Sequence, residues 1–158
     1  MGFALSDMQL SSPAFADGGA IPAKHTGEGV DVSPELAWRG APQGTRGFAV
    51  ICHDPDAPLV TSNGTYGFVH WVLYNIPASA KGLPEGVQEH TAGRNDFGKT
   101  GYGGPMPPPG HGPHRYYFWV LALDTEAQLE AGLTLWQLLE RVEPNVIGMN
   151  RLVGTYQR

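Results

Sequence analysis

The sequence predicts a mainly β fold, a sandwich of two antiparallel sheets with one or two short peripheral helices. Three segments that begin at Gly47, Gly67 and Arg115 are nearly continuous in β-branched and aromatic residues, as buried strands are. The chain also holds 22 glycines and 14 prolines among 158 residues, which is typical of a fold with many turns. Strands this apolar must be covered on both faces, so a sandwich is favoured over an open sheet.

Turn-forming residues divide the chain into short elements. Asp17-Gly18-Gly19 separates two short apolar stretches and predicts a hairpin turn. The two prolines at positions 34 and 42 leave room only for a short strand at about 36–38. The strands GFAVICHD (from position 47), GFVHWVLYNIP (from 67) and RYYFWVLALD (from 115) then form the centre of the fold.

One helix is clearly indicated near the C-terminus. Thr134 is followed three residues later by Gln137, which has the form of a capping box. Apolar residues follow at helical spacing, and Pro144 ends the helix. The tail NRLVGTYQR is expected to return as a last strand.

Size and charge narrow the class of protein. A chain of 158 residues is large enough for one core, so we expect a single domain over residues 1–158. A net charge of −5 without a basic cluster argues against a nucleic-acid partner. The N-terminus lacks the features of a signal peptide, and no stretch approaches the length of a membrane span. We therefore expect a soluble, cytoplasmic protein whose single cysteine, Cys52, is buried.

Polar residues interrupt the apolar strands at three places. They are HDPDAP at 53–58, His70 within FVHWV, and HGPHRY at 111–116. A buried polar group without a partner costs about 1 to 3 kcal/mol, so these side chains are expected to meet one another. Strand alternation places His114 and Tyr116 on one face and Arg115 on the other.

The two aspartates of DPDAP have different expected partners. Asp56 is expected to pair with Arg115, and Asp54 is left to orient His70 or His114 through a ring nitrogen. A carboxylate beside the imidazoles is also expected to favour their protonated, hydrogen-bond-donating form.

Several motifs together resemble one known family. SPELAW, DPDAP, FVHWVLYNIP, YGGPMPPPGHGPHRYYF and LVGTYQR occur in the order and spacing of the phosphatidylethanolamine-binding proteins, also called Raf-kinase-inhibitor-like proteins, in their bacterial and archaeal branch. The resemblance runs from about Met8 to the end of the chain. It implies a β-sandwich with a small anion-binding pocket at one end.

The resemblance also implies which residues line that pocket. They are the first DPDAP aspartate, the strand histidine, the proline-rich loop, and the His and Tyr of HRY. Prolines hold such a loop stiff, and glycines beside them allow backbone to approach a ligand closely. With the second aspartate, the candidate ligand-binding set is Asp54, Asp56, His70, Gly104, Pro108, His114 and Tyr116.

The leading hypothesis is a binding or regulatory protein, not an enzyme, that needs no cofactor. It would bind phosphate, carboxylate or phosphoethanolamine-type groups, and modulation of a protein kinase or another protein partner is a further expected role. Apolar edge strands would also suit a homodimer.

Two alternatives belong to other classes. One is a metal-dependent hydrolase in which Asp54, His70 and His114 bind zinc and Asp56 acts as general base. The other is a protein that inhibits a kinase or protease through its surface loops alone.

Overall fold

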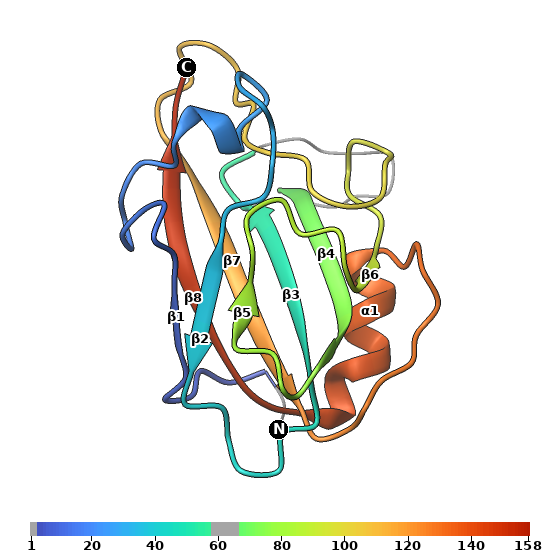
Figure 1. Ribbon diagram of the computed structural model, residues 1–158. Coiled ribbons are helices and arrows are strands. Elements are labelled where there is room, and N and C mark those ends of the chain that lie inside the picture. The colour runs from blue at the N-terminus through green and yellow to red at the C-terminus, as the bar shows by residue number, and fades with distance from the viewer. Residues whose placement is uncertain (1–2, 58–66) are drawn as a thin grey trace.

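Two antiparallel sheets form the body of the protein in the computed structural model, which describes residues 3–57 and 67–158 (Figure 1). The larger sheet has the order β6-β4-β3-β7-β8, and the smaller has the order β1-β2-β5. The larger sheet consists of β6 (Thr91–Ala92), β4 (Phe68–Pro77), β3 (Gly47–Asp54), β7 (His114–Leu123) and β8 (Val146–Tyr156). The smaller consists of β1 (Gln9–Ser11), β2 (Leu36–Arg39) and β5 (Gly82–Leu83). The predicted mainly β fold with two antiparallel sheets is confirmed.

The three segments predicted as central strands are neighbours in the larger sheet. β3 lies between β4 and β7 and pairs with both along nearly its whole length. The C-terminal tail forms β8, which pairs with β7 over ten residue pairs from His114↔Tyr156 to Leu123↔Val146. The three central strands lie where β-branched and aromatic residues predict them, whereas β8 begins at Val146, four residues before the predicted tail strand.

Both faces of the larger sheet are covered, as its apolar composition requires. Along β3, Val50 and Cys52 belong to the core between the two sheets, whereas Ala49 and Ile51 pack in a second core on the opposite face. The helix α1 (Leu135–Val142) supplies Leu138 to this second core. Figure 1 shows α1 beside the larger sheet, on the side away from the small one. Nearly continuous apolar strands therefore lie in the middle of three layers.

The capping box predicted for the helix is present. The Thr134 hydroxyl accepts a hydrogen bond from the Gln137 backbone N–H at 3.3 Å, and the Gln137 side-chain oxygen accepts one from the Thr134 N–H at 3.0 Å. After α1 the chain tightens into a 3-10 turn, η2 (Glu143–Asn145), which contains Pro144. A second 3-10 turn, η1 (Ala23–His25), lies near the N-terminus. The helical content is therefore small and peripheral.

The predicted hairpin at Asp17–Gly19 is wrong. The residues do form a turn, with Gly18 at φ +80°, but the segments on either side pair elsewhere. The Gly18 N–H donates to the Val153 carbonyl, and the Asp17 carboxylate accepts from the Val153 N–H. Ala20 then bridges Thr155 in parallel. The local sequence indicates a reversal of the chain, but the unpaired edge of β8 determines where the chain then goes.

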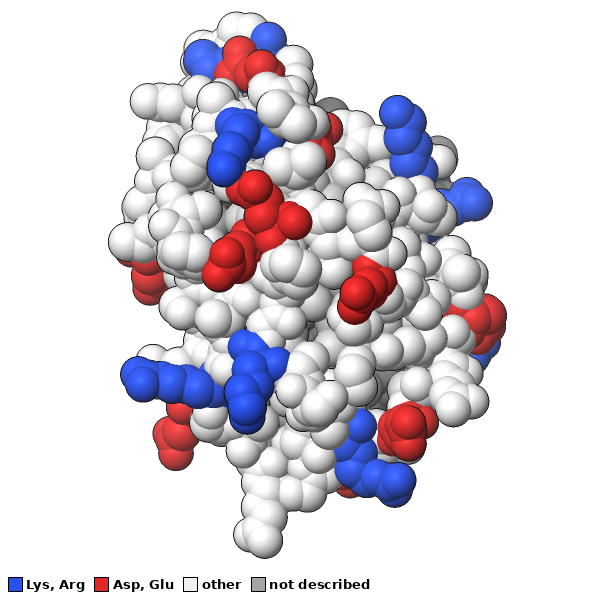
Figure 2. Space-filling view, viewed as in Figure 1, with Lys and Arg blue, Asp and Glu red and all other residues white. Residues whose placement is uncertain are grey.

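The surface combines charges of both signs. On the face shown in Figure 2, acidic and basic side chains are interspersed. Within residues 3–57 and 67–158, no helix combines the length and apolar character needed to cross a membrane.

The proline-rich strip, defined as residues 103–113, is fastened to three parts of the fold. The Gly103 N–H donates to the His70 carbonyl of β4 at 3.0 Å. The Gly104 N–H donates to the Asp31 carboxylate at 2.8 Å, and the Pro105 carbonyl accepts from Gly27 at 2.9 Å. The Gly110 N–H donates a hydrogen bond to the carbonyl of Arg158 at 3.1 Å. Prolines limit the conformations of the strip, and these bonds hold it in place.

Replacing the helix cap should destabilise the protein measurably. Thr134→Ala removes the hydroxyl that accepts from Gln137, and we expect a loss of about 1 kcal/mol in the free energy of unfolding. Urea denaturation measures this loss. Thr100→Ala, at an exposed threonine, is the control and should change stability by less than about 0.5 kcal/mol. Equal effects of the two substitutions would contradict the role of the cap.

A side chain at position 104 should destabilise the contact that holds the proline-rich strip to Asp31. A Cβ there would overlap the His25 carbonyl oxygen and the Asp31 carboxylate, and the carbonyl belongs to backbone that cannot move aside cheaply. We expect Gly104→Ala to cost about 3 kcal/mol in urea denaturation. Gly110→Ala in the same strip meets nothing within 4 Å and should cost only the strain of its positive φ, about 1 kcal/mol. If the Gly104→Ala protein were as stable as Gly110→Ala, the His25 backbone and the Asp31 side chain would have to move aside at little cost, which would contradict the prediction.

Candidate functional site

The candidate site lies at the end of the sandwich where β3 ends and β4 and β7 begin, near the C-terminus in Figure 1. A cavity of about 320 Å³ opens there. Five of the predicted residues line it: Asp54, His70, Pro108, His114 and Tyr116. Its remaining walls are Ala57, Phe68, Phe97, Met106, Pro107 and His111. The structure thus brings together side chains from three strands and the proline-rich strip.

A buried, hydrogen-bonded pair of side chains occupies the floor of this site. The Nδ1 atom of His114 lies 2.6 Å from Oδ2 of Asp54, and the two residues are 4% and 2% exposed. The other carboxylate oxygen of Asp54 accepts the backbone N–H of Asp56 at 2.8 Å. Because a carboxylate accepts hydrogen bonds, the proton lies on Nδ1 of His114. The second ring nitrogen, Nε2, is then left for other partners.

His111 extends this pair toward the surface. Its Nδ1 lies 3.2 Å from Nε2 of His114, while the His111 residue itself is exposed. A chain of hydrogen bonds therefore runs from the buried carboxylate through two imidazoles to the rim of the cavity. His111 was not among the candidate residues predicted from the sequence. Its place three residues before His114, between two glycines, is the one signal that could have included it.

A β-bulge directs His70 into the cavity. Cys52 pairs with Trp71 and His53 pairs with Val69, so His70 is the extra residue of β4. Such a bulge turns a side chain away from the regular alternation of the strand. The Nδ1 N–H of His70 donates to the Gly103 carbonyl at 2.7 Å, which fixes the ring against the proline-rich strip.

His70 is a neutral imidazole in this setting. Burial lowers the pKa of His70, and it outweighs the opposite influence of the Gly103 hydrogen bond and of Asp54. With its one proton on Nδ1, the ring carries a hydrogen-bond acceptor at Nε2. Asp54 does favour the protonated form of His70, as expected, but desolvation outweighs this influence and the pKa is lowered.

Tyr116 separates and supports the two histidines. Its ring meets the ring of His70 edge-on, with centroids 5.2 Å apart, and stacks with the ring of His114 at 6.5 Å. Burial, and then the charge of Asp54, raise the pKa of Tyr116 well above its ordinary value, so the phenol keeps its proton. Tyr116 therefore lines the cavity with an uncharged aromatic ring whose one polar atom is the phenol oxygen.

Two of the predicted residues do not line the cavity. Asp56 turns outward and forms an ion pair with Arg115, whose Nη2 and Nε atoms lie 2.8 and 3.0 Å from its carboxylate oxygens. The Arg115 guanidinium lowers the pKa of Asp56. Gly104 lies behind the rim, where its N–H is used by Asp31. The predicted pairing of Asp56 with Arg115 is present, and it holds the DPDAP turn against the start of β7.

The donor atoms do not converge as a zinc hydrolase would need. Both oxygens of Asp54 are occupied, one by His114 and one by the Asp56 N–H, and Nδ1 of His70 is occupied by Gly103. In the described part of the chain, no three His, Cys, Asp or Glu side chains gather around a common point. The geometry therefore gives no support to Asp54, His70 and His114 as a three-ligand metal site.

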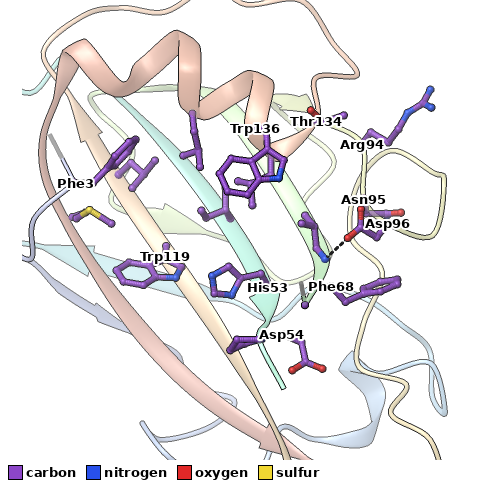
Figure 3. A pocket seen from close by; sticks show the side chains of 18 residues that line it. Phe3, His53, Asp54, Phe68, Arg94, Asn95, Asp96, Trp119, Thr134 and Trp136 are labelled. Carbon is purple, nitrogen blue, oxygen red and sulfur yellow. Dashed lines mark hydrogen bonds between the residues drawn. The ribbon is translucent and has the colours of Figure 1, made fainter. Parts of the chain in front are cut away.

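A larger cavity of about 810 Å³ lies between α1 and the outer face of the larger sheet (Figure 3). Two tryptophans, Trp119 from the sheet and Trp136 from the helix, point into it. The Asp96 carboxylate at its edge accepts the Val69 N–H at 2.7 Å. Asp54 is its only residue from the predicted set, and its walls are mostly apolar. The paired imidazoles thus distinguish the smaller cavity as the candidate site.

Comparisons with known proteins agree with the resemblance. The profile of the family described as phosphatidylethanolamine-binding protein matches residues 11–157. A UPF0098 protein of Methanothermobacter thermautotrophicus is 41% identical over 158 residues, which cover 96% of this chain and 99% of the relative.

Two solved structures are also similar over most of their length. One is a putative phosphatidylethanolamine-binding protein homolog from Chlamydia trachomatis, with a TM-score of 0.87 and 38% identity over 96% of this chain and 97% of that one. The other is YbcL of E. coli, a member of the mammalian phosphatidylethanolamine-binding protein family, with a TM-score of 0.86 and 33% identity over 97% and 99%. The protein described here therefore belongs to the phosphatidylethanolamine-binding protein family.

Proposed function

We propose that the cavity binds a small anionic group of the phosphate, carboxylate or phosphoethanolamine type, and that the protein is a binding or regulatory protein. The observation that carries this proposal is the buried pair of Asp54 and His114, 2.6 Å apart, with the second nitrogen of His114 toward the cavity rim. Modulation of a protein kinase by a ligand-occupied cavity is the regulatory role we expect.

The floor of the cavity suits an anionic oxygen. With a proton on Nε2, His114 is a charged hydrogen-bond donor, and Asp54 on the other side of the ring balances that charge. An anion would therefore meet a donor instead of a bare carboxylate. Phe68, Phe97 and Pro107 around the opening are apolar, and such walls exclude water and strengthen hydrogen bonds to the ligand.

The opposite wall suits a ligand that also carries a proton to donate. Neutral His70 presents an acceptor at Nε2, which could bind an ammonium group or the hydroxyl of a phosphate monoester. Phosphoethanolamine combines an anionic phosphate with an ammonium and would use both walls. Because the proline-rich strip is already held in place, little entropy would be lost there when a ligand binds.

Binding should depend on Nε2 of His114, the ring nitrogen that faces His111. His114→Asn keeps an amide N–H that can reach Asp54 but removes Nε2, and we expect it to weaken phosphoethanolamine binding by about tenfold or more. Isothermal titration with phosphate, acetate and phosphoethanolamine measures this effect. His90→Asn is the matched control, because His90 lies outside the cavity and its φ of 73° suits asparagine. The proposal fails if none of the three anions binds the unaltered protein, or if His114→Asn binds them equally well.

His70 should make the protein less stable in acid. The unfolded chain takes up a proton at His70 near its ordinary pKa of 6.5, whereas the folded protein does so only at lower pH. The free energy of unfolding should therefore fall as the pH is lowered from above 6.5 toward the folded pKa. His70→Asn keeps a side-chain donor for the Gly103 carbonyl but cannot be protonated, so its stability should fall less over the same range. Urea denaturation between about pH 7.5 and 5 compares the two, and parallel curves would refute the prediction.

A further inference from the structure

His114 on the floor of the cavity and His111 at its rim have the spacing of ligands to one metal ion. Nδ1 of His111 and Nε2 of His114 are 3.2 Å apart, and their ring centroids are 5.5 Å apart. Two nitrogens bound to one tetrahedral zinc or copper ion at about 2.0 to 2.1 Å are themselves about 3.3 Å apart. Because His111 is exposed, its side chain can move to aim its lone pair at an ion bound by Nε2 of His114.

Asp54 holds His114 in the form that binds metals. Its carboxylate accepts the Nδ1 proton at 2.6 Å, so the tautomer with an available Nε2 is selected and the ring cannot turn. A carboxylate behind a metal-binding histidine is the usual arrangement in protein metal sites, where it orients the ring and raises its basicity. The backbone N–H of Asp56 in turn holds the carboxylate.

We propose that His111 and His114 bind a divalent transition-metal ion, which takes the place of the proton the two rings share. Imidazole nitrogens favour copper, nickel and zinc, and copper(II) is bound most strongly in that series. This ion would lie at the mouth of the cavity, not among Asp54, His70 and His114 together.

The protein supplies only two ligands to such an ion. Nδ1 of His70 is already used by Gly103, and within the described residues no third His, Cys, Asp or Glu joins the pair. Because both histidines line the cavity, an oxygen of an anion bound there could supply a further ligand. This step rests on the proposed anion-binding function, and it implies that metal and anion strengthen each other's binding.

Copper titration with matched asparagine variants tests the proposal. We expect the chelator-treated full-length protein to bind one copper(II) ion per chain, with electron paramagnetic resonance showing two coordinated nitrogens, and phosphate to tighten the binding. His111→Asn and His114→Asn should each remove one nitrogen and weaken copper binding by about tenfold or more. His90→Asn should leave both readouts unchanged. His111→Asn is the decisive variant, because its exposed side chain is not needed for the core.

The outcomes separate this inference from the proposed function. Copper binding that is absent, or equal in His111→Asn and the unaltered protein, overturns the metal site. Two-nitrogen copper binding that phosphate does not tighten overturns the role of the anion as a ligand to the metal. Titration of the metal-free protein with phosphoethanolamine tests the proposed function independently. If phosphoethanolamine binds while the copper criterion fails, only the metal inference is lost.

Discussion

One buried carboxylate, Asp54, is the constraint on which the candidate site depends. An ionised group at 2% exposure needs hydrogen-bond donors close by, because water cannot solvate it. Asp54 obtains them from the Asp56 N–H and from Nδ1 of His114. These two bonds join the end of β3, the DPDAP turn and the start of β7. The same bonds determine which nitrogen of His114 is available, so one electrostatic requirement both closes the fold and sets the chemistry of the cavity.

The rest of the molecule keeps this arrangement rigid and dry. The larger sheet is packed on both faces, and the fully buried polar side chains of its described strands, Asp54, His70 and His114, lie together at one end. There the bulge at His70 supplies a second ring to the cavity, and the proline-rich strip closes the rim. The strip is bonded to β4, to Asp31 and to the C-terminus. A stiff rim over the buried Asp54–His114 pair distinguishes this cavity from the larger apolar one beside α1.

Much of the site could be predicted because local rules decide it. Strand alternation places His114 and Tyr116 inward and Arg115 outward, as the structure has them. The pairing of Asp56 with Arg115 follows from the need of a charge for a partner. Other features depend on the exact geometry of a turn. His111 reaches the site because the backbone at Gly110 and Gly112, both with positive φ, brings its ring beside His114 three residues later, and residue spacing alone does not predict that contact.

The sequence by itself determined the β-sandwich, its central strands and the capped helix, because apolar periodicity and capping residues act over a few neighbouring positions. Tertiary structure decided which side chains face the cavity and in which state. The bulge at His70 results from the register between β3 and β4, and its neutral ring results from burial. Gly104 was expected to contact a ligand. Its N–H is instead bonded to the carboxylate of Asp31, 73 residues earlier in the chain. Such outcomes depend on burial and partners that only the assembled layers create.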